Sequence, residues 1–221
     1  MNARSLVVGM AGGLLAPALA LGDVLDFEAT DFGNVPTGWA VAMTSDGGQP
    51  RWEVVSDPTS PSGEKVLAQV SDDKTAGRFP LAIYEGIETA DGSVSVRFKP
   101  VSGRVDQAAG LVWRYRDPGN YYIVRANALE NNVVLYKVEN GRRIPLPPVG
   151  RGDDYGVERR VPAQSWSALA VTFSGTRFVV TFDGARLFEV EDSTFTSAGK
   201  VGLWTKADSV TYFDGFEVTA R

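Results

Sequence analysis

The sequence predicts an all-β protein built as a two-sheet antiparallel β-sandwich. Short segments in which apolar and polar residues alternate recur at roughly 8–12-residue spacing. Turn-forming residues separate them, since the chain contains 24 Gly and 12 Pro. No segment shows a convincing helical repeat. A length of 221 residues, 43% of them hydrophobic, suits one such domain.

The first 20 residues differ in composition from the rest and predict a signal peptide. Arg4 supplies a positive start, the segment from Leu6 to Leu15 is apolar, and Ala18 and Ala20 are small residues at the cleavage-determining positions. A buried N-terminal helix is the alternative. We therefore expect a signal peptide over residues 1–20, a single domain over 21–221, and a location in the periplasm or outside a bacterial cell. No later run approaches the ~18 apolar residues that a membrane span needs.

Alternating patterns predict several strands in the first half of the chain. They cover Gly22–Thr30, Arg51–Ser56, Lys65–Val70, Ala82–Glu85 and Gly92–Pro100. Trp39 and Trp52 flank a Gly-rich loop, and we expect both to anchor the core rather than to stack on a ligand.

The stretch from Ala109 to Asn127 predicts a complete β-hairpin. Its turn is Asp117-Pro118-Gly119-Asn120, in which Gly119 would provide the positive φ of a type II turn. Pairing Asp117 with Asn120 sets Trp113 opposite Val124 and gives the hairpin two different faces. The core face carries Leu111, Trp113, Tyr115, Tyr122, Val124 and Ala126. The solvent face carries Arg114, Arg116, Tyr121, Arg125 and Asn127.

Further strands follow the hairpin. They are predicted over Val133–Val138, Trp166–Phe173, Arg177–Phe182, Arg186–Val190, Lys200–Thr205 and Val210–Val218. Asn140-Gly141 is a two-residue hairpin turn of the I′ type. The segment from Pro145 to Val161 is aperiodic and rich in Pro, Gly and charge, so we expect a mobile loop over an edge or a site.

Composition excludes several kinds of chemistry. The chain has neither His nor Cys, which removes His-dependent triads, His-ligated zinc and disulfides. Acid–base chemistry is left to carboxylates, Tyr or Lys. Loss of Arg4 with the signal peptide leaves 21 basic against 27 acidic residues, a net charge of −6. An acidic domain with scattered charge argues against a nucleic-acid partner.

Motifs spread along the chain resemble a known fold family. They are Pro36-x-Gly38-Trp39, Trp52-x-Val54, the run from Gly110 to Tyr122, Trp166 with Leu169, Val171 and the Asp183-Gly184 turn, and the ending from Gly199 to Val218. Together they resemble a concanavalin A-like jelly roll of the laminin-G type, and most of all the bacterial exported 3-keto-disaccharide hydrolase family. The resemblance implies a sandwich that binds or cleaves carbohydrate on the concave face of one sheet.

The solvent face of the hairpin is the candidate ligand site. Arg114 and Arg125 would be diagonal neighbours about 7–8 Å apart, so a nearby group must offset the repulsion between their positive charges. Carboxylates of adjacent strands are one explanation, and a ligand is the other. For the ligand, we expect donors and stacking rings from Arg114, Tyr121, Arg125, Asn127, Lys137 and Trp204.

An enzyme is the alternative from another class. Glycoside hydrolysis by two carboxylates is the one familiar mechanism that the composition allows. The strand signature Glu-x-Asp-x-x-Glu does not occur, and the catalytic residues are unknown. The acids considered are Glu130, Asp153, Asp154, Asp208 and the cluster from Glu189 to Asp192.

The resemblance also implies a structural calcium ion between the first and last strands. Glu28 and Asp214 lie in those strands and carry suitable oxygen ligands. Ordinary edge-strand charges are the alternative. The sequence thus predicts an exported, monomeric carbohydrate-binding domain, with a glycoside hydrolase or a cell-envelope interaction module as alternatives.

Overall fold

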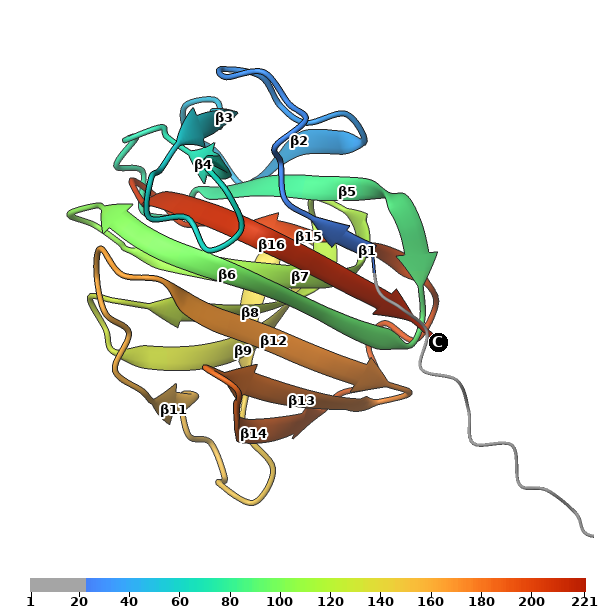
Figure 1. Cartoon of the computed structure of the whole chain (residues 1–221). Helices are drawn as coiled ribbons and strands as arrows, with labels where there is room; N and C mark the ends of the chain where they lie inside the picture. Colours follow the sequence, from blue (N-terminus) through green and yellow to red (C-terminus); the bar gives the residue numbers. More distant parts are fainter. Residues whose placement is uncertain (1–22) are drawn as a thin grey trace, which may run out of the picture.

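The protein folds as a two-layer β-sandwich. The computed structural model describes residues 23–221, so the predicted signal peptide lies outside the described residues. Figure 1 shows two antiparallel sheets stacked face to face. The predicted all-β jelly roll is confirmed. No helix within residues 23–221 is long and apolar enough to cross a membrane.

The first layer, sheet A, has eight strands in the order β14-β13-β12-β6-β16-β4-β3, with β1 paired to β16. Their bounds are β14 Ala185–Glu191, β13 Arg177–Phe182, β12 Ser167–Ser174, β6 Gly92–Ser102, β16 Val210–Ala220, β4 Lys65–Gln69, β3 Trp52–Ser56 and β1 Asp23–Leu25.

The second layer, sheet B, also has eight strands, in the order β10-β9-β8-β7-β15-β5-β2, with β11 paired to β9. Their bounds are β10 Arg142–Leu146, β9 Asn132–Glu139, β8 Asn120–Asn127, β7 Ala108–Asp117, β15 Gly199–Trp204, β5 Phe79–Thr89, β2 Trp39–Thr44 and β11 Val157–Glu158.

The strands that the sequence missed are short pieces of sheet B at or near its edges. β2 and β10 are the two edges, and β11 adds two residues beside β9. β10 contains Pro145, which an edge strand tolerates because one side of its backbone is unpaired. The first predicted strand is also shorter than expected. It ends at Leu25, and the chain turns at Phe27, whose φ is 65°.

A core of aromatic and aliphatic side chains fills the space between the sheets. Trp113 of β7 is fully buried, and its ring centroid lies 5.4 Å from that of Tyr122, 6.1 Å from Phe173 and 5.3 Å from Phe178. Leu111 and Val124 are buried in the same core, as are both Trp39 and Trp52. The predicted core positions of Trp113 and of both early tryptophans are confirmed.

The turn of the central hairpin differs from the predicted type. Asp117 pairs with Asn120 as expected, but Gly119 does not adopt a positive φ. Instead, the Asp117 carboxylate accepts a hydrogen bond from the Gly119 N–H at 2.7 Å. The Gly119 carbonyl in turn accepts one from the Gly141 N–H at 3.0 Å. Gly119 is therefore needed for the close approach of two turns rather than for its φ.

The predicted register beyond this turn was wrong. Trp113 pairs with Tyr122 rather than with Val124, because the ladder shifts between Trp113 and Asp117. Arg114 lies in this bulge with a φ of 48°. A bulge re-aims the side chains that follow it. Tyr115 consequently lies on the outer face of sheet B, with its ring 5.9 Å from that of Tyr121, and not in the core between the sheets.

Sheet B is curled, and its outer face is concave. β10 and β5 are separated by four other strands, so they would lie roughly 24 Å apart in a flat sheet. Yet the guanidinium of Arg143 on β10 lies 4.8 Å from the ring of Phe79 on β5. The concave face is filled by a second buried cluster: Phe79, Leu81, Ile83, Ala108, Val112, Tyr121, Ile123, Val134, Tyr136, Val138 and Trp204.

Candidate functional site

Arg114 does not lie on the concave face, so its predicted placement beside Arg125 was wrong. The bulge turns its side chain toward the core, where it is 1% exposed. The guanidinium donates hydrogen bonds to the carbonyl oxygens of Ala90 at 2.8 Å, Phe195 at 2.6 Å and Gly175 at 2.7 Å. Arg114 ties three loops together and is out of reach of a ligand on the concave face.

Arg125 lies on the concave face as predicted, near the end where β8 meets β9. It is 1% exposed and donates to Glu130 Oε2 at 2.7 Å and to the Asn132 side chain. It also donates to the hydroxyls of Tyr136 and Tyr155, each at 3.2 Å. Its charge is thus offset by a carboxylate, and both of its terminal guanidinium nitrogens are already hydrogen-bonded within the protein.

Asn127 continues this polar cluster. Its Nδ2 donates to Asp106 Oδ1 at 2.5 Å and to Glu130 Oε1 at 3.0 Å. Its Oδ1 accepts from the Leu129 N–H at 2.9 Å, so the same side chain also fixes the turn between β8 and β9. Asn127 is 1% exposed and holds the acids in place.

Two other predicted ligand residues, Tyr121 and Trp204, are buried rather than exposed to a ligand. Tyr121 is fully buried and its hydroxyl lies 2.8 Å from Thr44 Oγ1. Trp204 is fully buried and stacks on Phe79 with ring centroids 5.3 Å apart. Neither ring has a free face for a sugar.

Lys137 points to the opposite face from the one predicted. It pairs with Tyr122, a core residue, and its ammonium donates to Thr194 Oγ1 at 2.7 Å. The prediction failed because the apolar residues of β9 cover both faces. Val134, Tyr136 and Val138 fill the concave side and leave Lys137 at the sandwich edge.

An open pocket lies beside Arg125 at the rim of the concave face. It has a volume of about 530 Å³. It is lined by Glu130, Asn132, Arg151, Asp154, Tyr155, Gly156, Val157 and Glu158. A neighbouring hollow of about 560 Å³ shares Glu130 and Glu158 and adds Asn131, Arg159 and Arg160. We call the first hollow the Tyr155 pocket.

The Tyr155 pocket is formed largely by the loop between β10 and β11. The sequence singled out this segment as a loop over an edge or a site, and Asp153 and Asp154 within it as candidate acids, but not Tyr155. Tyr155 is 50% exposed, and its hydroxyl is bonded to Tyr136 and Arg125. An aromatic residue in a Gly- and Asp-rich loop is the signal that could have identified it.

Electrostatics fix Glu130 in its ionised form. Burial favours the neutral carboxyl, but the charge of Arg125 and hydrogen bonds from Asn132 and Arg125 outweigh burial and lower the pKa of Glu130. Asp106 shares the Asn127 amide with Glu130 and pairs with Lys206. Glu130 is therefore held as an anion by fixed partners.

This pair does not fit glycoside hydrolysis. That mechanism needs one carboxyl with a raised pKa as general acid, whereas the pKa of Glu130 is lowered and Asp106 is 1% exposed. Two other candidate acids are also engaged within the protein: Asp208 accepts hydrogen bonds from three backbone N–H groups, and Glu189 pairs with Arg177. A further candidate acid, Asp154, lines the Tyr155 pocket.

Glu28 and Asp214 do not fit a calcium site. Glu28 Oε1 accepts the N–H groups of Glu64 and Lys65 at 2.9 and 2.7 Å. Asp214 accepts the Ser62 N–H at 2.9 Å and the Ser62 hydroxyl at 2.5 Å. Donors aimed at these oxygens oppose a cation. Over residues 23–221, no group of three or more acidic side chains is arranged to hold a metal ion.

No family model matches the chain, and no curated protein matches it. Solved structures are similar in fold. The carbohydrate-binding module CBM66 from Bacillus subtilis is 19% identical, with a TM-score of 0.61, over 83% of this chain and 96% of that one.

Two other solved structures have a similar fold. The cellulose-induced protein Cip1 is 13% identical, with a TM-score of 0.64, over 90% of this chain and 97% of that one. Domain 4 of AbnA, a GH43 extracellular arabinanase from Geobacillus stearothermophilus solved with arabinotriose, is 14% identical, with a TM-score of 0.52, over 90% and 92%. At these identities the likeness shows the fold, a concanavalin A-like jelly roll, and the predicted resemblance is confirmed at that level.

Proposed function

We propose that the protein is an exported carbohydrate-binding domain that holds a neutral oligosaccharide in the Tyr155 pocket. The observation that carries the proposal is the half-exposed ring of Tyr155, anchored through its hydroxyl beside an open polar hollow. An aromatic ring that presents an apolar face and is held at its polar end is suited to stacking on a sugar ring.

Arg125 takes a positioning role in this proposal. It is too buried to meet a ligand, but it fixes the Tyr155 hydroxyl at 3.2 Å and the Glu130 carboxylate at 2.7 Å. A rigid ring and a rigid acceptor lose little conformational entropy when a ligand binds, which raises affinity.

The charges around the pocket favour a neutral ligand. Glu130, Asp154 and Glu158 line it together with one cation, Arg151, and Arg125 behind the pocket pairs with Glu130, so one negative charge is left without a basic partner. A uronic acid would be repelled by this balance, whereas the hydroxyls of a neutral sugar can donate to the carboxylates. Asn132 adds an amide that can both donate and accept.

The similar structures and the N-terminal sequence support this function without testing it. CBM66 is a carbohydrate-binding module, and the arabinanase domain was solved with arabinotriose. The apolar segment over residues 1–20 supports export to the periplasm or the medium.

A glycan array on residues 21–221, followed by calorimetry with the best neutral ligand, tests the proposal. Tyr155→Ala removes the ring and should weaken binding at least about tenfold. Tyr155→Phe keeps the ring but loses its anchor, and should weaken binding roughly two- to tenfold. Phe32→Ala is the matched control, since Phe32 is 54% exposed and lines neither rim hollow.

Equal affinities of Tyr155→Ala and the unchanged domain would contradict the assigned pocket. Failure to bind any neutral glycan would contradict the function itself and would favour the alternative of a cell-envelope interaction module.

A further inference from the structure

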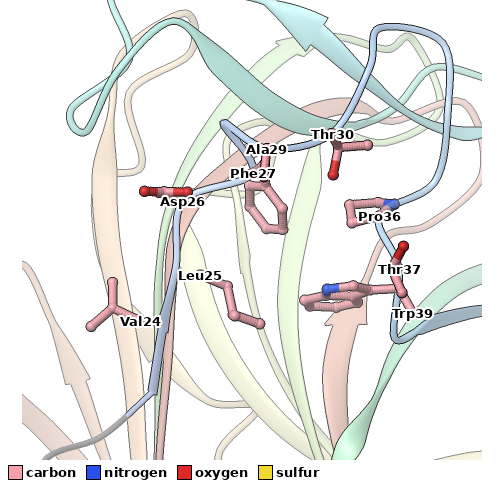
Figure 2. A pocket seen from close by; sticks show the side chains of 9 residues that line it. All are labelled: Val24, Leu25, Asp26, Phe27, Ala29, Thr30, Pro36, Thr37 and Trp39. Atoms are coloured by element: carbon pink, nitrogen blue, oxygen red, sulfur yellow. The ribbon is translucent and has the colours of Figure 1, made fainter.

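A second pocket lies at the opposite edge of sheet B from the Tyr155 pocket. It has a volume of about 260 Å³ and is built where β1 of sheet A and β2 of sheet B come together. Figure 2 shows its walls, which are Val24, Leu25, Asp26, Phe27, Ala29, Thr30, Pro36, Thr37 and Trp39. We call it the Trp39 pocket.

The backbone at Phe27 is strained in a way that shapes this pocket. Its φ of 65° lies in the left-handed region, which a bulky residue rarely adopts. Such a conformation is unfavourable and is concentrated at ligand sites. It turns the Phe27 ring against Trp39, with centroids 5.9 Å apart, so that both rings contribute to the floor of the pocket.

The pocket combines an apolar floor with a polar rim. Leu25, Phe27 and Trp39 supply the floor, and the indole nitrogen lies on the edge of the ring toward Phe27 (Figure 2). Only part of each ring reaches the pocket, because Phe27 is 5% and Trp39 8% exposed. The hydroxyls of Thr30 and Thr37 lie around it, whereas the carboxylate of Asp26 points away from Trp39 and accepts a hydrogen bond from the Glu28 N–H at 3.1 Å.

Charge narrows the class of ligand. Asp26 is the one ionisable side chain among the nine residues that line the pocket, and none of the nine is basic. An anion would meet a carboxylate and no cation, so an acidic ligand is disfavoured. A neutral ring with an apolar C–H face and hydroxyl groups matches the floor and the rim together.

We propose that the Trp39 pocket is a second sugar-binding site, which takes one neutral sugar ring, and that the domain is bivalent. Its geometry does not depend on the Tyr155 pocket, although both proposals assign a sugar. The two pockets lie at opposite edges of sheet B, near β2 and β11 (Figure 1). A polysaccharide that reaches both would bind more tightly than a trisaccharide through effective concentration.

The test follows the indole N–H resonance of Trp39 by NMR during titration of the ¹⁵N-labelled domain. The probes are arabinotriose and cellotriose as neutral sugars, and trigalacturonate as the acidic comparison. The resonance should shift with a neutral probe, both in the unchanged domain and in Tyr155→Ala. Thr37→Val should weaken this shift about fivefold in apparent affinity. Thr172→Val is the control, since Thr172 is exposed on sheet A.

The outcomes separate the two proposals. An indole signal that stays fixed while Tyr155-pocket resonances shift overturns the second site alone. A signal that moves in the unchanged domain but not in Tyr155→Ala also overturns it, because the sites would then be one. Binding at the Trp39 pocket with no response at the Tyr155 pocket supports this inference and contradicts the first proposal.

Discussion

Replacing Arg114 by alanine should destabilise the fold and leave sugar binding intact. The side chain is 1% exposed and donates to three carbonyl oxygens, in Ala90, Phe195 and Gly175, at 2.6–2.8 Å. It also lies over the rings of Phe173 and Phe178, at 5.9 and 5.5 Å.

The magnitude follows from those contacts. A hydrogen bond from a charged donor contributes about 1.5–3 kcal/mol, and each carbonyl left buried without a partner adds a penalty. Removal of a desolvated charge offsets part of the loss. We therefore expect Arg114→Ala to lower the free energy of unfolding by about 3–5 kcal/mol.

Urea unfolding followed by tryptophan fluorescence measures this loss. Arg116→Ala is the matched control, because Arg116 is exposed and its guanidinium lies 5.0 Å from the Phe195 ring. It should cost less than about 1 kcal/mol. A loss under about 1 kcal/mol for Arg114→Ala, or weaker sugar binding by the folded variant, would refute the reasoning.

Four further outcomes are expected. Trp113→Ala should cost about 3–5 kcal/mol in urea unfolding, because the ring is fully buried between the sheets. Burial opposes ionisation of Glu130 and Asp192, but their partners outweigh it and lower both pKa values in the folded state. Stability from these groups is present above about pH 4 and lost as pH falls through the folded pKa values. Because the chain has no His, urea midpoints should be flat between about pH 5 and 8. A calcium chelator should leave the melting temperature unchanged. Mass spectrometry of protein exported by a bacterial host should show the first ~20 residues missing.

Periodicity and turn chemistry predicted the fold because they are local properties of the chain. Trp113, Leu111 and Val124 were assigned to the core correctly, since alternation along a strand fixes which residues share a face. The bulge at Arg114 escaped this reasoning. Nothing in the local pattern signals that a non-glycine residue adopts a φ of 48° and reverses the faces beyond it.

The candidate site depended on long-range geometry. Trp204 and Tyr121 have the composition of a sugar platform, but the curl of sheet B places Arg143 over the Trp204 ring at 5.8 Å and buries both aromatic side chains. The periodicity of a sequence does not reveal how strongly the sheet it forms is curled. Tyr155 lies in an aperiodic loop, so only the folded chain shows that it meets Arg125.

A crystal structure of the domain soaked with its tightest-binding neutral oligosaccharide tests the central claim most directly. The account predicts a sugar ring stacked on Tyr155, with its hydroxyls bonded to Glu130 or Asn132. A sugar bound over Trp204 on an opened concave face, with the Tyr155 pocket empty, would contradict it.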